Sequence, residues 1–153
     1  HRQRPDLPFV IVGDGRWRQR AETLAQRLGL SDVVRFTGWI KDPVKAFEQL
    51  QILVLPSLWE GMPFVLLEGM ALCKPVIGTR VNGMPEVIDD QQNGLLVPSG
   101  DPQAMAAAIL ELVDHPDRAQ QLSEQAIADV RERFDVETMA ALTMAVYEAV
   151  VEK

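Results

Sequence analysis

The stretch that decides the fold is residues 52–72, which read ILVLPSLWEGMPFVLLEGMAL. Its first four residues are apolar without a break, which is typical of a central strand of a parallel sheet, because such a strand is covered on both faces. Pro63 can open a helix, since its missing N–H is no loss in the first turn. The stretch therefore predicts a buried strand, a tight loop and a helix over residues 64–72.

The rest of the chain alternates in the same way between short apolar runs and helical patterns. Further strands are expected at residues 7–12, 33–36, 76–78 and 95–97, and helices at residues 43–50, 85–88, 102–113, 117–133 and 136–152. We expect Val44 and Phe47 to face inward in one of these helices. Another helix is expected after Gly15, where Leu24, Leu28 and Leu30 share one face.

Strands that alternate with helices through short loops predict an α/β fold. We interpret residues 1–153 as a single three-layer, Rossmann-like domain: a parallel sheet with helices on both faces, followed by C-terminal helices. Ligands of such sheets bind at the carboxyl ends of the strands. Because the chain begins at His1 without a methionine or a signal-peptide pattern, we expect residue 1 to be internal to a longer polypeptide.

Composition narrows the classes of function. The net charge is −7, and residues 101–153 carry 11 acidic against 4 basic residues, so we expect no nucleic-acid partner. The basic residues in excess within residues 1–50 either attract a small anion or lie on solvated faces of loops and helices. A single cysteine and two distant histidines indicate no metal site and favour the reducing cytoplasm. No apolar run approaches the ~20 residues of a membrane span.

Two acidic residues stand out around the loop of the opening stretch. Glu68 interrupts an apolar helix in which Phe64, Leu67, Met70, Ala71 and Leu72 are expected to face inward. It is either a surface glutamate or a carboxylate among core residues, which needs a partner such as the two hydroxyls of a ribose. Glu60 precedes the helix and is either an acceptor for sugar hydroxyls or an ordinary loop residue. Free N–H groups at the start of the helix favour a phosphate between the two acids.

Glu60 to Glu68 resembles the Glu-(seven residues)-Glu motif of retaining glycosyltransferases of the two-Rossmann-domain (GT-B) type, glycosyltransferase family 4. The resemblance extends through VIVGDG, VRFTGWI, ILVLPSLWEGMPFVLLEGMA, KPVIGT, VNGMPEVI and NGLLVPSGD. The combination is specific, whereas GDG alone is a weak signal. The resemblance implies that this chain is the C-terminal, donor-binding domain of such an enzyme.

The resemblance assigns roles position by position. It implies that Glu60 contacts the donor sugar as the catalytic-site acid and that Glu68 holds the nucleotide ribose. It places the phosphate-binding loop at Gly61, Met62, Phe64 and Val65. The pocket for the nucleotide base falls at Trp39 and Ile40, and the loop that flanks the donor cleft falls at Gly13 and Gly15. Plain packing for Trp39, and plain turns for the glycines, stay open as alternatives. Cys73 is expected to be a buried bystander rather than a nucleophile.

The implied reaction moves a hexosyl unit from a nucleoside-diphosphate sugar to a saccharide, lipid-linked or small-molecule acceptor, as in polysaccharide biosynthesis. No metal or cofactor is implied. The family's first strand-helix unit, with its phosphate-binding cations, and its N-terminal acceptor domain are absent from these residues, so we expect donor binding without turnover. We expect peripheral membrane association only through those absent parts. A non-catalytic nucleotide-sugar-binding module, or an epimerase or phosphorylase of the same fold, remains an alternative.

Overall fold

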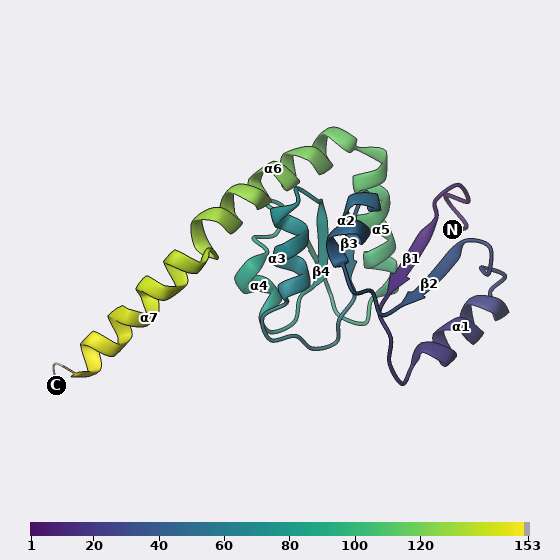
Figure 1. Ribbon diagram of the computed structural model, residues 1–153. Helices are drawn as coiled ribbons and strands as arrows, with labels where there is room; N and C mark the ends of the chain where they lie inside the picture. Colours follow the sequence, from purple (N-terminus) through teal and green to yellow (C-terminus); the bar gives the residue numbers. More distant parts are fainter. Residues whose placement is uncertain (152–153) are drawn as a thin grey trace. The chain divides into compact units, whose positions relative to one another are not determined.

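The computed structural model describes residues 1–151 (Figure 1). The chain divides into two compact units, His1–Ala46 and Phe47–Lys153, and each is described by itself. Its twelve elements are β1 (Phe9–Val12), α1 (Arg18–Arg27), β2 (Val34–Gly38), α2 (Pro43–Gln49), β3 (Leu53–Leu55), α3 (Phe64–Ala71), β4 (Val76–Thr79), α4 (Met84–Val87), β5 (Leu95–Val97), α5 (Pro102–Asp114), α6 (Pro116–Arg133) and α7 (Val136–Val151). The predicted end of the last helix at Glu152 lies outside the described residues.

In the first unit, β1 and β2 form a parallel pair that begins at Phe9 opposite Val34. Ala25 is the buried residue of α1, whereas Leu24 is 55% and Leu28 59% exposed. The prediction that these leucines form an inward face is therefore wrong. A two-stranded sheet offers little surface for these side chains to pack against.

In the second unit, β3, β4 and β5 form a parallel sheet in that order. Side chains alternate between its two faces. Leu53, Leu55 and Val76 pack in one cluster with residues of α3, α4 and α6. Ile77 and Leu95 pack in another cluster with residues of α5 and α6. The predicted cover on both faces of the β3 region is confirmed.

The predicted α/β class is confirmed, with parallel strands and helices on both faces. The strands form two sheets in the described residues, one of β1 and β2 and one of β3, β4 and β5, rather than the single sheet that we expected. Residues 43–50 fold largely as predicted, with Phe47 buried, but Val44 is exposed because it lies on the outer side of the short helix α2.

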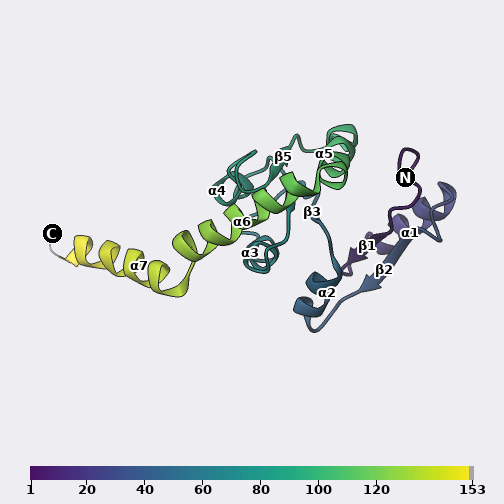
Figure 2. The same cartoon turned by 90° about the horizontal axis from the view of Figure 1, so that it is seen from above.

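The C-terminal helices behave differently from one another. Asp101 caps α5 as predicted, because its side chain accepts a hydrogen bond from the Ala104 N–H at 2.9 Å. Helix α6 buries Leu122 and Ala126 against the sheet clusters. Helix α7 has no buried residue among those described and projects from the rest of its unit (Figure 2). Within residues 1–151, no helix has the length and apolarity needed to cross a membrane.

Candidate functional site

The predicted site lies where β3 ends and α3 begins. β3 stops at Leu55, residues 56–63 form the loop, and Phe64 opens the helix. Glu60 is half-buried in this loop, and one of its carboxylate oxygens, Oε1, accepts a hydrogen bond from the Ser57 hydroxyl at 2.7 Å. No protein donor within residues 1–151 bonds the other oxygen. The loop therefore orients a carboxylate and leaves one of its oxygens open to a ligand hydroxyl.

Glu68 is exposed, so the interpretation as a surface glutamate is confirmed, whereas the expected inward positions of Phe64, Ala71 and Leu72 are wrong. Helix α3 buries Leu66, Gly69 and Met70, and each residue of a helix turns the side-chain direction by about 100°. Glu68, two residues from both Leu66 and Met70, consequently lies on the opposite, exposed face together with Phe64, which is 71% exposed. An exposed carboxylate needs no buried partner, so the desolvation argument for a ribose does not apply. Its exposure does leave it accessible to a ligand.

The amino end of α3 carries unsatisfied donors. Pro63 precedes the helix, and its side chain makes no cap. The Leu66 N–H bonds back to the Pro63 carbonyl at 2.9 Å, but the N–H groups of Phe64 and Val65 have no acceptor within the described residues. Because α5 begins with the side-chain cap of Asp101, the two helix starts differ. Free N–H groups and the helix dipole make the start of α3 suited to an anion.

The remaining predicted residues lie in the first unit, at the carboxyl ends of β1 and β2. The Gly13 N–H donates to the Gly38 carbonyl at 2.9 Å, which brings the loop of Gly13 and Gly15 beside the one that leads into Trp39 and Ile40. Trp39 is 74% exposed, so core packing does not account for it, whereas Ile40 is half-buried. The structure thus gathers these four residues at one end of the two-stranded sheet.

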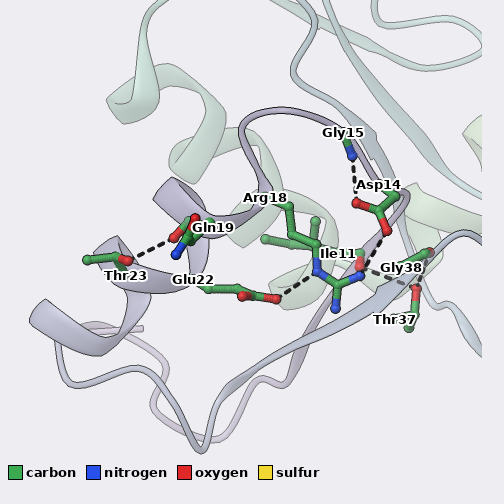
Figure 3. A network of polar contacts seen from close by, with 9 residues as sticks. All are labelled: Ile11, Asp14, Gly15, Arg18, Gln19, Glu22, Thr23, Thr37 and Gly38. Atoms are coloured by element: carbon green, nitrogen blue, oxygen red, sulfur yellow. Dashed lines mark hydrogen bonds and ion pairs between the residues drawn. The ribbon is translucent and has the colours of Figure 1, made fainter.

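Polar contacts brace the loop between β1 and α1 (Figure 3). The Asp14 carboxylate accepts hydrogen bonds from the Gly15 N–H at 2.7 Å and from Arg18 at 3.2 Å, and Arg18 also donates to Glu22 at 2.8 Å. These carboxylates raise the pKa of the Arg18 guanidinium. Gly13 and Gly15 have φ angles of 126° and 159°. The conformation of Gly13 favours glycine, so a turn requirement alone explains that residue.

The basic excess of the N-terminal region is partly engaged within the protein. Arg16 and Arg20 lie over the ring of Trp17, at 5.0 and 5.5 Å from its centroid, and Arg18 forms the ion pairs described above. These contacts favour the interpretation of the basic excess as solvated faces rather than as an anion site. They also account for the exposed position of Trp17, because cations stack on an aromatic face.

Sequence reasoning missed two residues of the site and gave the wrong exposure for Cys73, which lies outside it. Thr79 is buried at the end of β4 and donates to the Ser57 carbonyl at 2.5 Å. Ser57 was not singled out, although it stands three residues before Glu60, within reach of a local hydrogen bond. A hydroxyl at the end of an otherwise apolar strand was the available signal for Thr79. Cys73 is exposed rather than buried, because it lies just beyond the last turn of α3.

Parallel strands with helices on both faces define a Rossmann-like α/β fold. Residues 1–129 match the family described as glycosyl transferases group 1. The chain belongs to that family. An uncharacterized glycosyltransferase of Methanocaldococcus jannaschii, MJ1178, is 33% identical over 144 residues, which cover 94% of this chain and 41% of that protein.

Solved structures share the fold. A sucrose-phosphate synthase from Thermosynechococcus elongatus superposes with a TM-score of 0.86 at 29% identity, over 98% of this chain and 40% of that chain. The C-terminal domain of LpcC, a glycosyl transferase group 1 family protein from Francisella tularensis, superposes with a TM-score of 0.78 at 26% identity, over 88% of this chain and 73% of that chain. The chain thus spans less than half of MJ1178 and of the synthase but most of an isolated C-terminal domain.

Proposed function

We propose that this chain is the nucleotide-sugar-binding domain of a retaining hexosyltransferase. The observation that carries the proposal is the arrangement of residues 56–68. The unbonded N–H groups of Phe64 and Val65 are suited to a diphosphate. Glu60, with one oxygen open, is suited to sugar hydroxyls, and the exposed Glu68 to a ribose diol. Membership of the glycosyl transferases group 1 family supports this assignment.

The chemical role of these residues follows from the charge that develops in the reaction. As the sugar leaves the diphosphate, the ring becomes cationic and the phosphate gains negative charge. The N–H groups of Phe64 and Val65 at the start of α3, together with the nearby N–H of Met62, are already in place. Their dipoles would stabilise the phosphate without reorganising. Glu60 would hold the sugar ring in a reactive orientation. Residues of the first unit, Trp39 and Ile40 above all, would contact the base.

The rest of the reaction would depend on residues outside this chain. The chain spans 41% of the length of MJ1178, so we propose that the acceptor site and the cations that neutralise the departing diphosphate lie in the remainder of the whole protein. The exposed apolar side of α7, which includes Met139 and Leu142, would pack against that remainder. We therefore propose that this chain binds the donor without transferring it, and that the whole enzyme acts in the cytoplasm on a saccharide, lipid-linked or small-molecule acceptor.

A thermal-shift panel tests donor binding. The chain is heated with millimolar UDP-glucose, GDP-mannose or ADP-glucose, and one nucleotide series is expected to raise the melting temperature. A ligand at a hundred times its dissociation constant stabilises the folded state by about 2.7 kcal/mol. Glu68→Ala is expected to reduce the shift, whereas Glu137→Ala, which removes a carboxylate on α7, is the matched control. No shift with any of the three donors would reject the proposal.

Retention is tested in the whole protein. The product of sugar transfer is analysed by the proton coupling of its anomeric carbon, and the configuration of the donor is expected to be kept. An inverted product would reject the retaining mechanism and leave the donor-binding assignment standing. Transfer by the 153-residue chain alone, above the rate in buffer, would show that the remainder of the protein is dispensable.

A further inference from the structure

The loop that carries Glu60 is tied to the sheet by a side chain. The last paired residues of β3 and β4 are Leu55 and Gly78. Thr79, one residue further, is 3% exposed, and its backbone pairs with Val97 of β5 on the other side. Its hydroxyl donates to the Ser57 carbonyl at 2.5 Å. The Thr79 side chain therefore adds one hydrogen bond beyond the last pair of β3 and β4. This bond joins β4, the central strand of this sheet, to the loop that follows β3.

Ser57 passes this constraint on to Glu60. Its carbonyl is held by Thr79, and its hydroxyl donates to Glu60 Oε1 at 2.7 Å. A hydrogen bond to an ionised carboxylate is stronger than one between neutral groups, and it fixes the direction of the acceptor. The chain of contacts runs from a buried strand residue through a loop residue to the carboxylate. Glu60 thus has a defined orientation before any ligand binds.

A close backbone contact holds the other side of the loop. A Cβ atom placed on Gly83 would lie 1.6 Å from the Gly61 carbonyl oxygen and 2.8 Å from its carbon. Gly83 has φ −67° and ψ −9°, an ordinary helical conformation, so the position needs glycine for space and not for its backbone angles. The peptide between Gly61 and Met62, one residue beyond Glu60, therefore rests directly on Gly83, the residue before α4. Any larger side chain at position 83 would push the loop away.

We infer that Thr79 and Ser57 are positioning residues that orient Glu60 toward the donor sugar, and that Gly83 sets the height of the same loop. The inference rests on the proposed function of Glu60. We call the two hydrogen bonds that connect Thr79 through Ser57 to Glu60 the hydroxyl relay. The relay affects binding of the sugar of the donor and not of its nucleotide. The inference predicts a selective effect on affinity. Removal of a relay hydroxyl weakens binding of the nucleotide sugar and leaves binding of the nucleoside diphosphate without the sugar unchanged.

The experiment compares each donor with its own diphosphate by calorimetric titration of the chain: UDP-glucose with UDP, GDP-mannose with GDP, and ADP-glucose with ADP. Ser57→Ala and Glu60→Gln are each expected to weaken the sugar nucleotide about tenfold and the diphosphate less than twofold. The double variant is expected to bind as Glu60→Gln does, because two residues that act through one contact are not additive. Additive losses, or equal losses for donor and diphosphate, would overturn the inference.

Thr79 is tested by a conservative pair. Thr79→Val keeps the shape and removes the hydroxyl, and Thr79→Ser keeps the hydroxyl. The valine variant is expected to lose donor affinity as Ser57→Ala does, while the serine variant restores it; equal losses in both would overturn the relay. Ser123→Ala, which removes a buried hydroxyl of α6, is the matched control and is expected to leave donor affinity unchanged.

The two levels of the argument fail in different ways. If Glu60→Gln leaves the affinity for every sugar nucleotide unchanged, the proposed role of Glu60 is rejected, and the relay is rejected with it. If Glu60→Gln weakens the donor selectively but Ser57→Ala does not, the proposed role stands and the relay is overturned. A Ser57→Ala variant that does not fold would leave Thr79→Val against Thr79→Ser as the deciding comparison.

Discussion

The two units of the chain contain equally apolar strands but bury them to very different degrees. In the second unit, Val76 and Ile77 of β4 are fully buried. In the first unit, Val10, Ile11 and Val12 of β1 are 43–45% exposed. The difference lies in the layers: β4 has clusters of helical residues on both faces, whereas β1 pairs with β2 alone and contributes no residue to either cluster. Apolar composition thus predicts a strand, and the neighbouring layers decide how far it is buried.

Truncation of a leucine in each unit gives the largest expected effect. Leu66 in α3 is fully buried, so Leu66→Ala should lower the free energy of unfolding by about 2–5 kcal/mol. Leu24 in α1 is half-exposed, and Leu24→Ala should cost about 0.5 kcal/mol or less, since alanine also favours the helix. Urea denaturation followed by circular dichroism measures both. Equal losses would contradict the exposed position of Leu24.

A glycine pair tests how closely the loop of the second unit is packed. Gly83→Ala places a methyl group against the Gly61 carbonyl, so it should destabilise the protein by about 1–3 kcal/mol, as overpacking does. Gly61→Ala meets nothing within 4 Å and is expected to leave stability nearly unchanged. The comparison is made by thermal unfolding without ligand. A Gly83→Ala variant as stable as the parent chain would contradict the close contact.

The order of strands and helices was accessible from the sequence because it depends on local patterns. The helix from Phe64 was predicted from Pro63 and its apolar run, and the cap of α5 from Asp101. The direction in which individual side chains point could not be predicted from these local patterns. In α3 nearly every residue is apolar, so the sequence contains no polar stripe to mark the outer face. It therefore leaves both a core and a surface position open for Glu68, and the structure shows that Leu66 and Met70 occupy the core.

The contacts that hold the site were inaccessible for a different reason. Thr79 and Ser57 are 22 residues apart, and they meet because β3 and β4 are neighbours in register. The missing side chain of Gly83 makes room for the Gly61 carbonyl. Such requirements come from parts of the chain that are distant in sequence. No periodicity or spacing within one segment could reveal them.

Two helix ends offer a third comparison of the units. Helices α1 and α3 both end with paired backbone bonds, from Leu30 to Ala25 and from Lys74 to Gly69, which are typical of the Schellman motif. The left-handed residue is Gly29 in the first unit, with φ 68°, and Cys73 in the second, with φ 56°. A side chain in this conformation costs about 1–2 kcal/mol. The second unit therefore tolerates strain that the first avoids.

Exchange of these residue types should move stability in opposite directions. Cys73→Gly is expected to raise the free energy of unfolding by about 1 kcal/mol, since its weak contact with the Ser123 hydroxyl, at 3.5 Å, is the main interaction lost. Gly29→Ala is expected to lower it by a similar amount. Urea midpoints measure both changes. Destabilisation by Cys73→Gly would mean that the thiol contributes more to packing than its exposed position indicates.

The smallest expected effect concerns an ion pair at the edge of the first unit. Arg4 donates to both carboxylate oxygens of Asp6, at 3.0 and 2.9 Å, and this hydrogen bonding lowers the pKa of Asp6. Because the folded pKa lies below the unfolded one, about 3.9, the associated stability is present above that pH and is lost as the pH falls through the folded pKa.

Arg4→Gln should therefore raise the pKa of Asp6 in a carbon-detected NMR titration. Loss of this ion pair should lower the urea midpoint at pH 7 only slightly, because solvent screens a pair between two accessible side chains. A large loss of stability at pH 7 would show that the first unit depends on surface charge to a degree that the second, with its buried strands, does not.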